Sequence, residues 1–446
     1  MDGTGMNGQF PEAFVERMRQ QLGNELPVFL HALNGPVVRG IRLNPLKKTE
    51  AALKYASRDQ IPWDPDGYYL DAGSDAGASI LHAAGAFYIQ EPCAMLPAAV
   101  LDAKPGEKIL DLCAAPGGKS TQIGCAMRGE GLLVCNEPIP KRAQILSGNI
   151  ERMGLPNTVV TNEWPDRLAD RWTEGFDAVL VDAPCSGEGM FRRDPETRKE
   201  WTAEKAEGCA VRQREILAAA VKLVRPGGRL IYSTCTYNPA ENEGNARWLT
   251  DTYPEFHTEP FSLPGIEAPD GIYTCYPHRL KGEGQFAAAF RKAGNKPAAL
   301  PADHSIPKPA GTDSAMFETA FPSFPKATHL FGRTLAFIPE LPDLKGIKTL
   351  RIGLHLGEIK GKTAIPDHAA GLCFRAPEVR VLDLGPEEAV KFMAGETVPG
   401  NAAGWILLRY QGLAVGWGKG SEGMIKNHYP KGLRGQKFVP QKGEAG

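Results

Sequence analysis

The stretch EKILDLCAAPGGKS (residues 107–120) decides the fold of this 446-residue chain. It reads as an apolar strand, a Gly-rich loop and the start of a helix predicted over 118–127, and the same alternation then continues. Strands separated by helices of this length predict right-handed βαβ units and a doubly wound parallel sheet, so the fold class is α/β. The further predicted strands are LLVCNE (132–137), NTVVTN (157–162), FDAVLVD (176–182) and RLIYSTC (229–235), and the further helices are KRAQILSGNIERMG (141–154) and 208–224.

The sequence on either side of this core differs in character. Residues 11–22 have the spacing of an amphipathic helix, and RGIRLNPLKKTE (39–50) resembles a strand with a basic exit, which suggests a small α+β domain. The Pro- and Ala-rich segment 293–313 is typical of a linker. Short apolar runs such as TLRIGLHL beyond it, with one helix at 386–394, predict a compact, mostly β module. The expected units are 1–75, 76–293, a linker at 294–313, and 314–446.

Composition limits the possible classes of protein. The chain has 51 basic and 52 acidic residues, which argues against a polybasic protein but still allows a local nucleic-acid-binding face. We see no signal peptide and no apolar run long enough to span a membrane. The nine cysteines include no Cys-x-x-Cys pair, so we expect reduced thiols in a cytoplasmic protein and no metal site.

The C-terminal tail is basic and contains two aromatic rings. Its cations are interleaved with His428 and Tyr429, which predicts a surface for phosphate contact and stacking, although a solvated tail is the alternative. These cations are Lys419, Lys426, Lys431, Arg434, Lys437 and Lys442.

The Gly-rich loop predicts a nucleoside ligand. It lacks both the dinucleotide-binding and the P-loop spacing, but Gly117 and Gly118 let backbone N–H groups approach a ligand at a helix N-terminus. Glu137 ends the second strand, where a carboxylate typically accepts ribose hydroxyls. A small anionic group on an adenosine fits S-adenosylmethionine, whereas a tight turn with a capping Glu is the purely structural alternative.

Two predicted strands each end in a cysteine. Cys185 follows Asp182 in VDAPCSGEGMF (181–191), and Cys235 lies in YSTCTYNPAENE (232–243). A lone strand-end cysteine is more often packing than nucleophile, but two beside one carboxylate favour chemistry. Methylation at carbon 5 of a pyrimidine needs such a thiolate, because carbon 5 becomes nucleophilic only after addition at carbon 6. Asp182 is placed to protonate or hydrogen-bond ring nitrogen 3 during this addition. The target base must also be flipped out of its stack to be reached.

These residues carry a family resemblance. LDLCAAPGGKS, VDAPCSGEGMF and YSTCTYNPAENE resemble three motifs of the RNA 5-methylcytosine methyltransferases of the NOL1/NOP2/Sun family. The tail GWGKGSEGMIKNHYPKGLR (416–434) is similar to bacterial RsmF-type members. The resemblance implies a class I (Rossmann-like) methyltransferase core, with an N-terminal RNA-binding domain and a C-terminal PUA-like domain.

The resemblance also implies residue roles. Cys235 is the expected nucleophile, Cys185 assists release of the methylated base, and Asp182 lies near both the methyl donor and the base. DNA enzymes attack with the Pro-Cys cysteine instead, so Cys185 as nucleophile is the rival assignment. The expected S-adenosylmethionine-binding residues are Cys113, Ala114, Ala115, Pro116, Gly117, Gly118, Lys119, Glu137 and Asp182.

One position departs from the family pattern. An aspartate usually follows the third strand and reaches the adenine amino group, whereas TNEWPDRL (161–168) has Trp164 there. Adenine recognition is therefore left open among backbone, stacking and the neighbouring Glu163. Arg142 occupies a recurring position in the helix after the second strand, where it is expected to orient the crevice wall or to give structural support.

The function that follows is cytosine-5 methylation of structured RNA, with small-subunit (16S) ribosomal RNA as the expected partner and transfer RNA as an alternative. No DNA or membrane partner is expected, and oligomeric state is left open. An RNA-binding assembly factor that has lost catalysis is the second hypothesis, and the intact cysteines speak against it. A nucleotide-dependent oxidoreductase fails at the Gly-rich loop.

Overall fold

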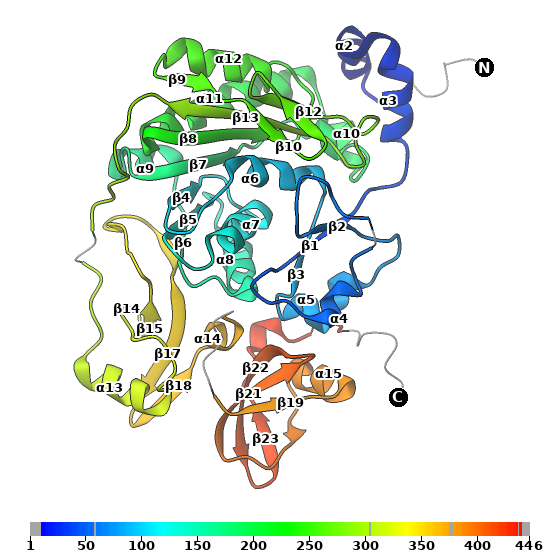
Figure 1. Cartoon of the computed structure of the whole chain (residues 1–446). Coiled ribbons are helices and arrows are strands. Elements are labelled where there is room, and N and C mark those ends of the chain that lie inside the picture. Colours follow the sequence, from blue (N-terminus) through cyan, green and yellow to red (C-terminus); the bar gives the residue numbers. More distant parts are fainter. Residues whose placement is uncertain (1–9, 58, 303–304, 374–378, 436, 439–446) are drawn as a thin grey trace.

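The fold is built around one large sheet (Figure 1). The computed structural model describes residues 10–57, 59–302, 305–373, 379–435 and 437–438. The strand order is β12-β13-β8-β7-β4-β5-β6-β16, and β9 pairs with β13. These strands are β4 (Lys108–Asp111), β5 (Leu132–Asn136), β6 (Thr158–Thr161), β7 (Phe176–Asp182), β8 (Val224–Thr234), β9 (Phe256–Thr258), β12 (Ile272–Cys275), β13 (Gln285–Lys292) and β16 (Thr349–Ile352).

Five neighbouring strands, β4 to β8, are parallel, which confirms the predicted doubly wound sheet. Their apolar runs are buried on both faces, as expected for parallel strands covered by helices. β8 starts earlier than the predicted strand at 229–235, because Val224 already pairs with Phe176 and residues 225–228 continue the strand. The chain order reverses between β4 and β7, where open α/β sheets bind ligands beyond the carboxyl ends.

Helices cover both faces of this sheet. Alternate residues of β4 point to opposite sides, so Ile109 packs with the cluster of α6, α7 and α8, and Leu110 with that of α9, α11 and α12. The bounds are α6 (Leu96–Leu101), α7 (Gly118–Met127), α8 (Pro140–Met153), α9 (Pro165–Arg171), α10 (Glu196–Glu200), α11 (Ala203–Leu223) and α12 (Glu243–Thr252), with a small hairpin of β10 (Phe261–Leu263) and β11 (Ile266–Ala268).

The N-terminal region has two parts. The helices α2 (Glu12–Leu22) and α3 (Leu26–Leu33) pack against the core, and the predicted helix at 11–22 is confirmed. A three-stranded sheet of order β2-β1-β3 follows, made by β1 (Gly40–Leu43), β2 (Gly67–Tyr69) and β3 (Phe87–Gln90), with the short helices α4 (Glu50–Leu53) and α5 (Ile80–Ala83). β3 lies beyond the boundary expected at residue 75, so we propose that this unit extends to about residue 92.

The C-terminal region is more divided than the single module that was expected. It contains α13 (Gly311–Ala320), a sheet of β14 (His329–Phe331), β15 (Thr334–Phe337), β17 (Leu354–Lys360) and β18 (Thr363–Pro366), and α14 (His368–Leu372). A second sheet follows, with β19 (Val381–Asp383), β20 (Val398–Pro399), β21 (Gly404–Tyr410), β22 (Leu413–Ser421) and β23 (Met424–Asn427), beside the predicted helix α15 (Pro386–Ala394). β16 leaves this region and pairs with β6 at the edge of the central sheet.

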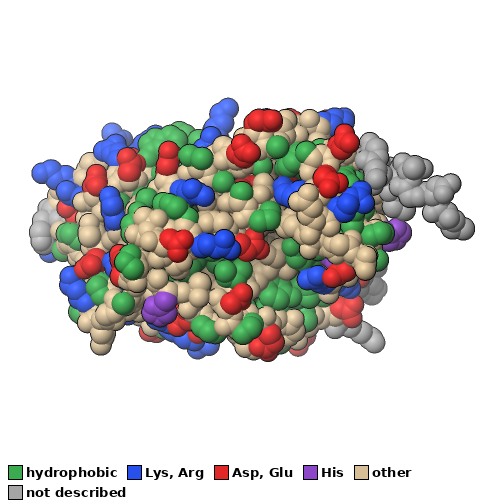
Figure 2. All heavy atoms as spheres, turned by 90° about the horizontal axis from the view of Figure 1, so that it is seen from above, with side chains coloured by type: hydrophobic (Ala, Val, Ile, Leu, Met, Phe, Trp, Pro, Cys, Tyr) green, Lys and Arg blue, Asp and Glu red, His purple; other side chains and the backbone are tan. Residues whose placement is uncertain are grey.

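The surface carries both charge signs. Figure 2 shows Lys and Arg interspersed with Asp and Glu over the face seen from above, as the net charge of −1 leads one to expect. Among the described residues, no helix is long and apolar enough to cross a membrane.

Candidate active site

The two strand-end cysteines meet. β7 and β8 are adjacent and parallel, and Asp182 pairs in register with Ser233, so the residues that follow both strands emerge at the same edge of the sheet. Cys185 Sγ lies 3.2 Å from Cys235 Sγ, and each thiol is partly exposed. The hydrogen bond to Cys235, and after it burial, raise the pKa of the Cys185 thiol well above its ordinary value. Cys185 therefore holds its proton beside Cys235.

Asp182 is held by three polar groups. Lys119 Nζ donates to Asp182 Oδ2 at 2.7 Å, and Ser233 Oγ and Gln285 Nε2 donate to Oδ1 at 3.0 and 3.3 Å. Burial alone would lower the pKa of the Lys119 ammonium, but the adjacent Asp182 carboxylate outweighs it and raises that pKa. Lys119 was expected to contact the cofactor, and its observed partner is Asp182.

Two cavities lie at this edge of the sheet and share Cys113. One, of about 400 Å³, is lined by Asp182, Lys119 and Cys235 together with the Gly-rich loop, and Cys185 is not among its lining residues. The other, of about 640 Å³, is lined by Glu137, Ile139 and Trp164. The expected cofactor residues and the expected nucleophile thus line two cavities that share Cys113.

The Gly-rich loop is fixed from the helix that follows the next strand. Gly117 adopts φ 114°, a conformation that favours glycine, immediately before α7. Arg142 Nη2 donates to the carbonyl of Ala115 at 3.0 Å, and its Nη1 lies 3.3 Å from Glu137 Oε2. Arg142 therefore joins the loop to the expected ribose-binding carboxylate, which agrees with the role of orienting the crevice wall.

A buried oxygen shows that the cavity suits S-adenosylmethionine. Asp111 Oδ2 accepts from Ser120 Oγ at 2.6 Å, whereas its Oδ1 is buried without a hydrogen-bond partner among the described residues. Asp111 lines the same cavity as the Gly-rich loop. A buried carboxylate oxygen needs a donor, and the ammonium of a methionine moiety would supply one. Cys113 to Lys119, Glu137 and Asp111 would hold such a cofactor.

The titration of Asp111 makes cofactor binding depend on pH. Burial raises the pKa of Asp111 to about 7, against an opposing hydrogen bond from Ser120. Below that pH the carboxyl is neutral and cannot pair with an ammonium, so the affinity for S-adenosylmethionine should rise by up to about tenfold per pH unit until pH 7. Calorimetric titration from pH 5.5 to 7.5 measures this slope. Asp111→Asn should bind weakly with no slope, and a flat wild-type profile would contradict the assignment.

The contacts of Glu163 bear on which residue recognises the adenine of the cofactor. Glu163 Oε1 accepts from the Lys348 backbone N–H at 3.0 Å, and Oε2 lies 3.3 Å from Arg167. Both oxygens of that carboxylate therefore contact protein groups, and Glu163 does not line the 640 Å³ cavity. Trp164, a residue that is 62% exposed, does line this cavity, and so does Asp166. Stacking on Trp164 is thus favoured over contact with Glu163.

Some contributors were not apparent from the sequence. Asp111 lies inside a predicted strand, and no pattern marks it as a site residue. The sequence does not predict that Ser233 and Gln285 contact Asp182, because these contacts depend on strand pairing. Gln285 begins β13, an antiparallel strand that pairs with β8. No cluster of potential metal ligands occurs in the part of the chain that the structure describes.

The expected stacking surface of the tail is only partly formed. Tyr429 is 4% exposed and packs against His368 and Phe392, so this ring is not available to a base. Arg434 is also engaged, because it donates to the Tyr429 carbonyl. The exposed His428 instead packs against Trp405, and Lys442 lies outside the described residues.

Family profiles match along most of the chain. The family described as 16S rRNA methyltransferase RsmB/F matches residues 98–291. Three further profiles match the N-terminal domain of 16S rRNA methyltransferase RsmF at 10–92, the first C-terminal domain of the RsmF rRNA methyltransferase at 316–374, and the PUA domain of the methyltransferase RsmF at 379–435.

Individual proteins agree with these profiles. Ribosomal RNA small subunit methyltransferase F of Escherichia coli O81 is 32% identical over 95% of this chain and 96% of its own length. A solved methyltransferase homologue from Pyrococcus horikoshii is 28% identical, with a TM-score of 0.57 over 65% of this chain and 100% of its own. NSun6 from the same organism, solved with the S-adenosylmethionine analogue SFG, is 23% identical over the same shares and has the same fold, again with a TM-score of 0.57. The chain is thus an S-adenosylmethionine-dependent RNA methyltransferase, and it belongs to the RsmF family of 16S rRNA methyltransferases.

Proposed function

We propose that this enzyme methylates carbon 5 of cytosine in small-subunit ribosomal RNA through a covalent bond between Cys235 and carbon 6 of the base. The observation that carries the proposal is the cavity in which Cys235 lies with Asp182 and Lys119, 3.2 Å from a second thiol. The names of the relatives support the choice of small-subunit ribosomal RNA.

The first step is addition of the Cys235 thiolate. Its electron pair forms the Sγ–C6 bond, and a proton reaches ring nitrogen 3 through Asp182. The Lys119 ammonium, 2.7 Å from that carboxylate, can replace the proton. The ring then carries electron density on carbon 5, as an enamine does. Lys119 and Asp182 thus act on the charge that develops during addition.

The remaining steps exchange a proton for a methyl group. Bound S-adenosylmethionine supplies an electrophilic methyl group on a sulfonium centre. Once Cys235 is bonded to carbon 6, Cys185 gives its own proton to water. Carbon 5 would take the methyl as the bond between that methyl and the donor sulfur breaks. The Cys185 thiolate then removes the proton from carbon 5, and the C6–Sγ bond breaks as the ring regains its double bond. The proton on nitrogen 3 returns to Asp182, and Cys235 leaves as a thiolate. The assignment of Cys235 over Cys185 is supported by its place in the cavity and by the protonated state of Cys185.

The test is direct identification of the product. The purified protein is incubated with methyl-labelled S-adenosylmethionine and either free small-subunit ribosomal RNA or the assembled subunit, and the RNA is digested to nucleosides. We expect label in 5-methylcytidine with at least one of these substrates. Label in another nucleoside would overturn the carbon 5 chemistry, and no label with either RNA would favour an inactive assembly factor.

Bisulfite sequencing extends this test to the cell. RNA from a deletion strain should lack one or more 5-methylcytidines that the parent strain contains, which names the target. A loss confined to transfer RNA would replace the ribosomal substrate while keeping the chemistry. Because ribosomal RNA is a cytoplasmic substrate in bacteria, we place the reaction in the cytoplasm.

A further inference from the structure

The N-terminal helices lie against the segments that follow both cysteines. Phe14 of α2 contacts Phe191 edge-on, with ring centroids 5.0 Å apart, and Phe29 of α3 contacts Tyr237 at 5.1 Å. All four rings are buried in one apolar cluster together with Trp201. This region is expected to form part of an RNA-binding domain, and its two helices also pack on the catalytic half of the chain.

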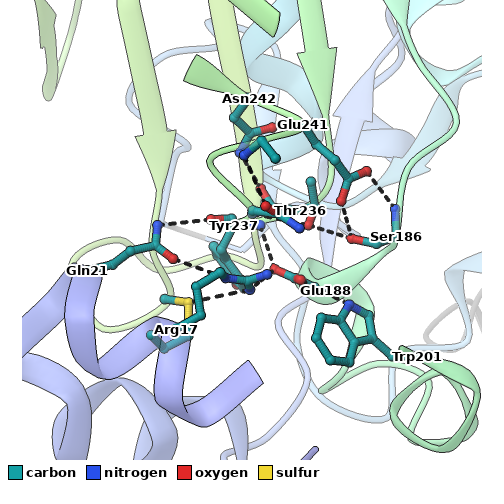
Figure 3. Close-up of polar contacts among 12 residues, drawn as sticks. Arg17, Gln21, Ser186, Glu188, Trp201, Thr236, Tyr237, Glu241 and Asn242 are labelled. Atoms are coloured by element: carbon teal, nitrogen blue, oxygen red, sulfur yellow. Dashed lines mark hydrogen bonds and ion pairs between the residues drawn. The ribbon is translucent and has the colours of Figure 1, made fainter. Parts of the chain in front are cut away.

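A buried carboxylate forms the centre of this contact (Figure 3). Glu188, three residues after Cys185, has a side chain that is 0% exposed. It accepts hydrogen bonds from Arg17 Nη2 at 2.7 Å, Trp201 Nε1 at 3.0 Å and the Tyr237 backbone N–H at 3.1 Å. A charge buried this deeply is tolerated only when it is paired and hydrogen-bonded, so Arg17 keeps this connection intact.

The second cysteine segment is held from the same helix. Tyr237, two residues after Cys235, donates its N–H to Glu188, and its carbonyl accepts from Gln21 Nε2 at 3.1 Å. The Cys235 carbonyl itself accepts from the Gly189 N–H at 2.8 Å. Two side chains one helical turn apart on α2 thus hold the segments beyond the cysteines, Arg17 through the Glu188 carboxylate and Gln21 through the Tyr237 carbonyl (Figure 3).

A further link joins the two segments beside the thiols. Ser186 Oγ lies 2.8 Å from Thr236 Oγ1, and it donates to Glu241 Oε1 at 2.5 Å. This link lies inside the core and involves no residue of α2. The approach of the cysteines is therefore secured on one side by the core and on the other by the N-terminal helix.

We infer that Arg17 and Gln21 are positioning residues, and that α2, together with the link inside the core, holds Cys185 and Cys235 in contact for catalysis. The inference rests on the proposed function, because it takes the two thiols as the reacting groups. Displacement of either segment would separate the sulfur atoms or turn Cys235 from the base, and misplacement by about 1 Å can cost about 100-fold in rate.

The test compares Arg17→Met with Arg17→Lys and with Arg19→Met. Methionine keeps an unbranched stem against Phe14 and Trp201, and lysine keeps the charge for Glu188. Arg19 is a matched control on the same helix, where its partner Glu16 is exposed. We expect kcat for RNA methylation to fall about 100-fold in Arg17→Met, with KM and S-adenosylmethionine affinity within a few-fold of wild type. Arg17→Lys should recover most of the loss, and Arg19→Met should match wild type.

A thiol reagent tests, without RNA, whether Cys185 and Cys235 lie close enough to be bridged. Phenylarsine oxide condenses with two neighbouring thiols and releases water, and peptide mass mapping identifies the pair that is bridged. The Cys185–Cys235 bridge should form readily in wild type and Arg19→Met and slowly in Arg17→Met. Should Arg17→Met fail to fold, Gln21→Ala removes the hydrogen bond to the Tyr237 carbonyl and the one that Gln21 Oε1 accepts from Arg17 Nε. This variant should lower kcat about tenfold, with slower bridging.

The outcomes separate the two proposals. If wild type methylates RNA and the Arg17 and Gln21 variants match it in both kcat and bridging, α2 does not position the cysteines. If bridging depends on Arg17 but wild type forms no 5-methylcytidine, the positioning holds and the proposed function fails.

Discussion

Methyl transfer to RNA is expected to fall on the order of 10⁶-fold when Cys235 is replaced by alanine, which is the scale seen when an enzyme loses its nucleophile. Without Sγ no bond to carbon 6 forms, and carbon 5 of the aromatic ring does not take the methyl group. Incorporation of labelled methyl into RNA under single-turnover conditions measures the loss.

A matched control comes from another thiol of the chain. Cys209 on α11 is partly exposed and does not line the two cavities at the active site. Cys209→Ala should methylate like wild type, and both variants should keep their affinity for S-adenosylmethionine within a few-fold. Substantial activity in Cys235→Ala, with labelled 5-methylcytidine as product, would remove the proposed mechanism.

Replacing Cys185 by alanine should leave the enzyme joined to its RNA. The hydrogen bond to Cys235 is the largest cause of the raised pKa that keeps the Cys185 thiol protonated. That hydrogen bond is lost when Cys235 Sγ bonds to carbon 6, which removes the largest cause of the raised Cys185 pKa at the stage at which a base is needed. Without this thiol, proton removal from carbon 5 should slow by about 10³-fold, a typical contribution for general base catalysis.

The readout is a protein–RNA band that survives SDS, together with a burst of about one methyl group per enzyme before turnover slows. The band should be absent in the double variant Cys185→Ala, Cys235→Ala. If instead Cys235→Ala forms the stable band and Cys185→Ala is inert, the roles of the two cysteines are exchanged.

The core of the fold could be predicted because its signals are local. Each parallel strand is an apolar run of strand length that ends in a polar or turn residue, and the chemistry lies at those ends. Asp182, Cys185 and Cys235 could therefore be assigned to one edge of the sheet. Their distances could not be predicted, because the 3.2 Å approach of the thiols depends on the loops that follow the strands.

For helix α2, the sequence pattern predicts which face is buried but not what that face packs against. The spacing of Phe14, Met18 and Leu22 predicts that α2 buries one face, and the structure buries all three. Nothing in that spacing says that the face packs against Phe191 and Tyr237, which lie far along the chain. The role of Arg17 follows only from this long-range contact.

One glycine in the C-terminal region separates two strands that belong to different sheets. TLRIGLHL (349–356) is one short apolar run in the sequence, but Gly353 has φ 54°, and a Cβ there would meet the Phe337 carbonyl oxygen. The chain turns at this residue, so that β16 joins the central sheet while β17 joins the next one. A glycine in an apolar run is compatible with a strand, and the sequence pattern does not reveal the change of sheet.

This arrangement has a consequence during protein synthesis. The strand that covers β6 is not complete until residue 352 has been added, long after the catalytic cysteines have been translated. Until then the nascent catalytic sheet presents the bare N–H and C=O groups of β6, which other chains can pair with. A version truncated after the linker would keep that exposed edge permanently and would be prone to aggregate. The RNA-modifying half of the enzyme is therefore finished by a strand from the half that follows it.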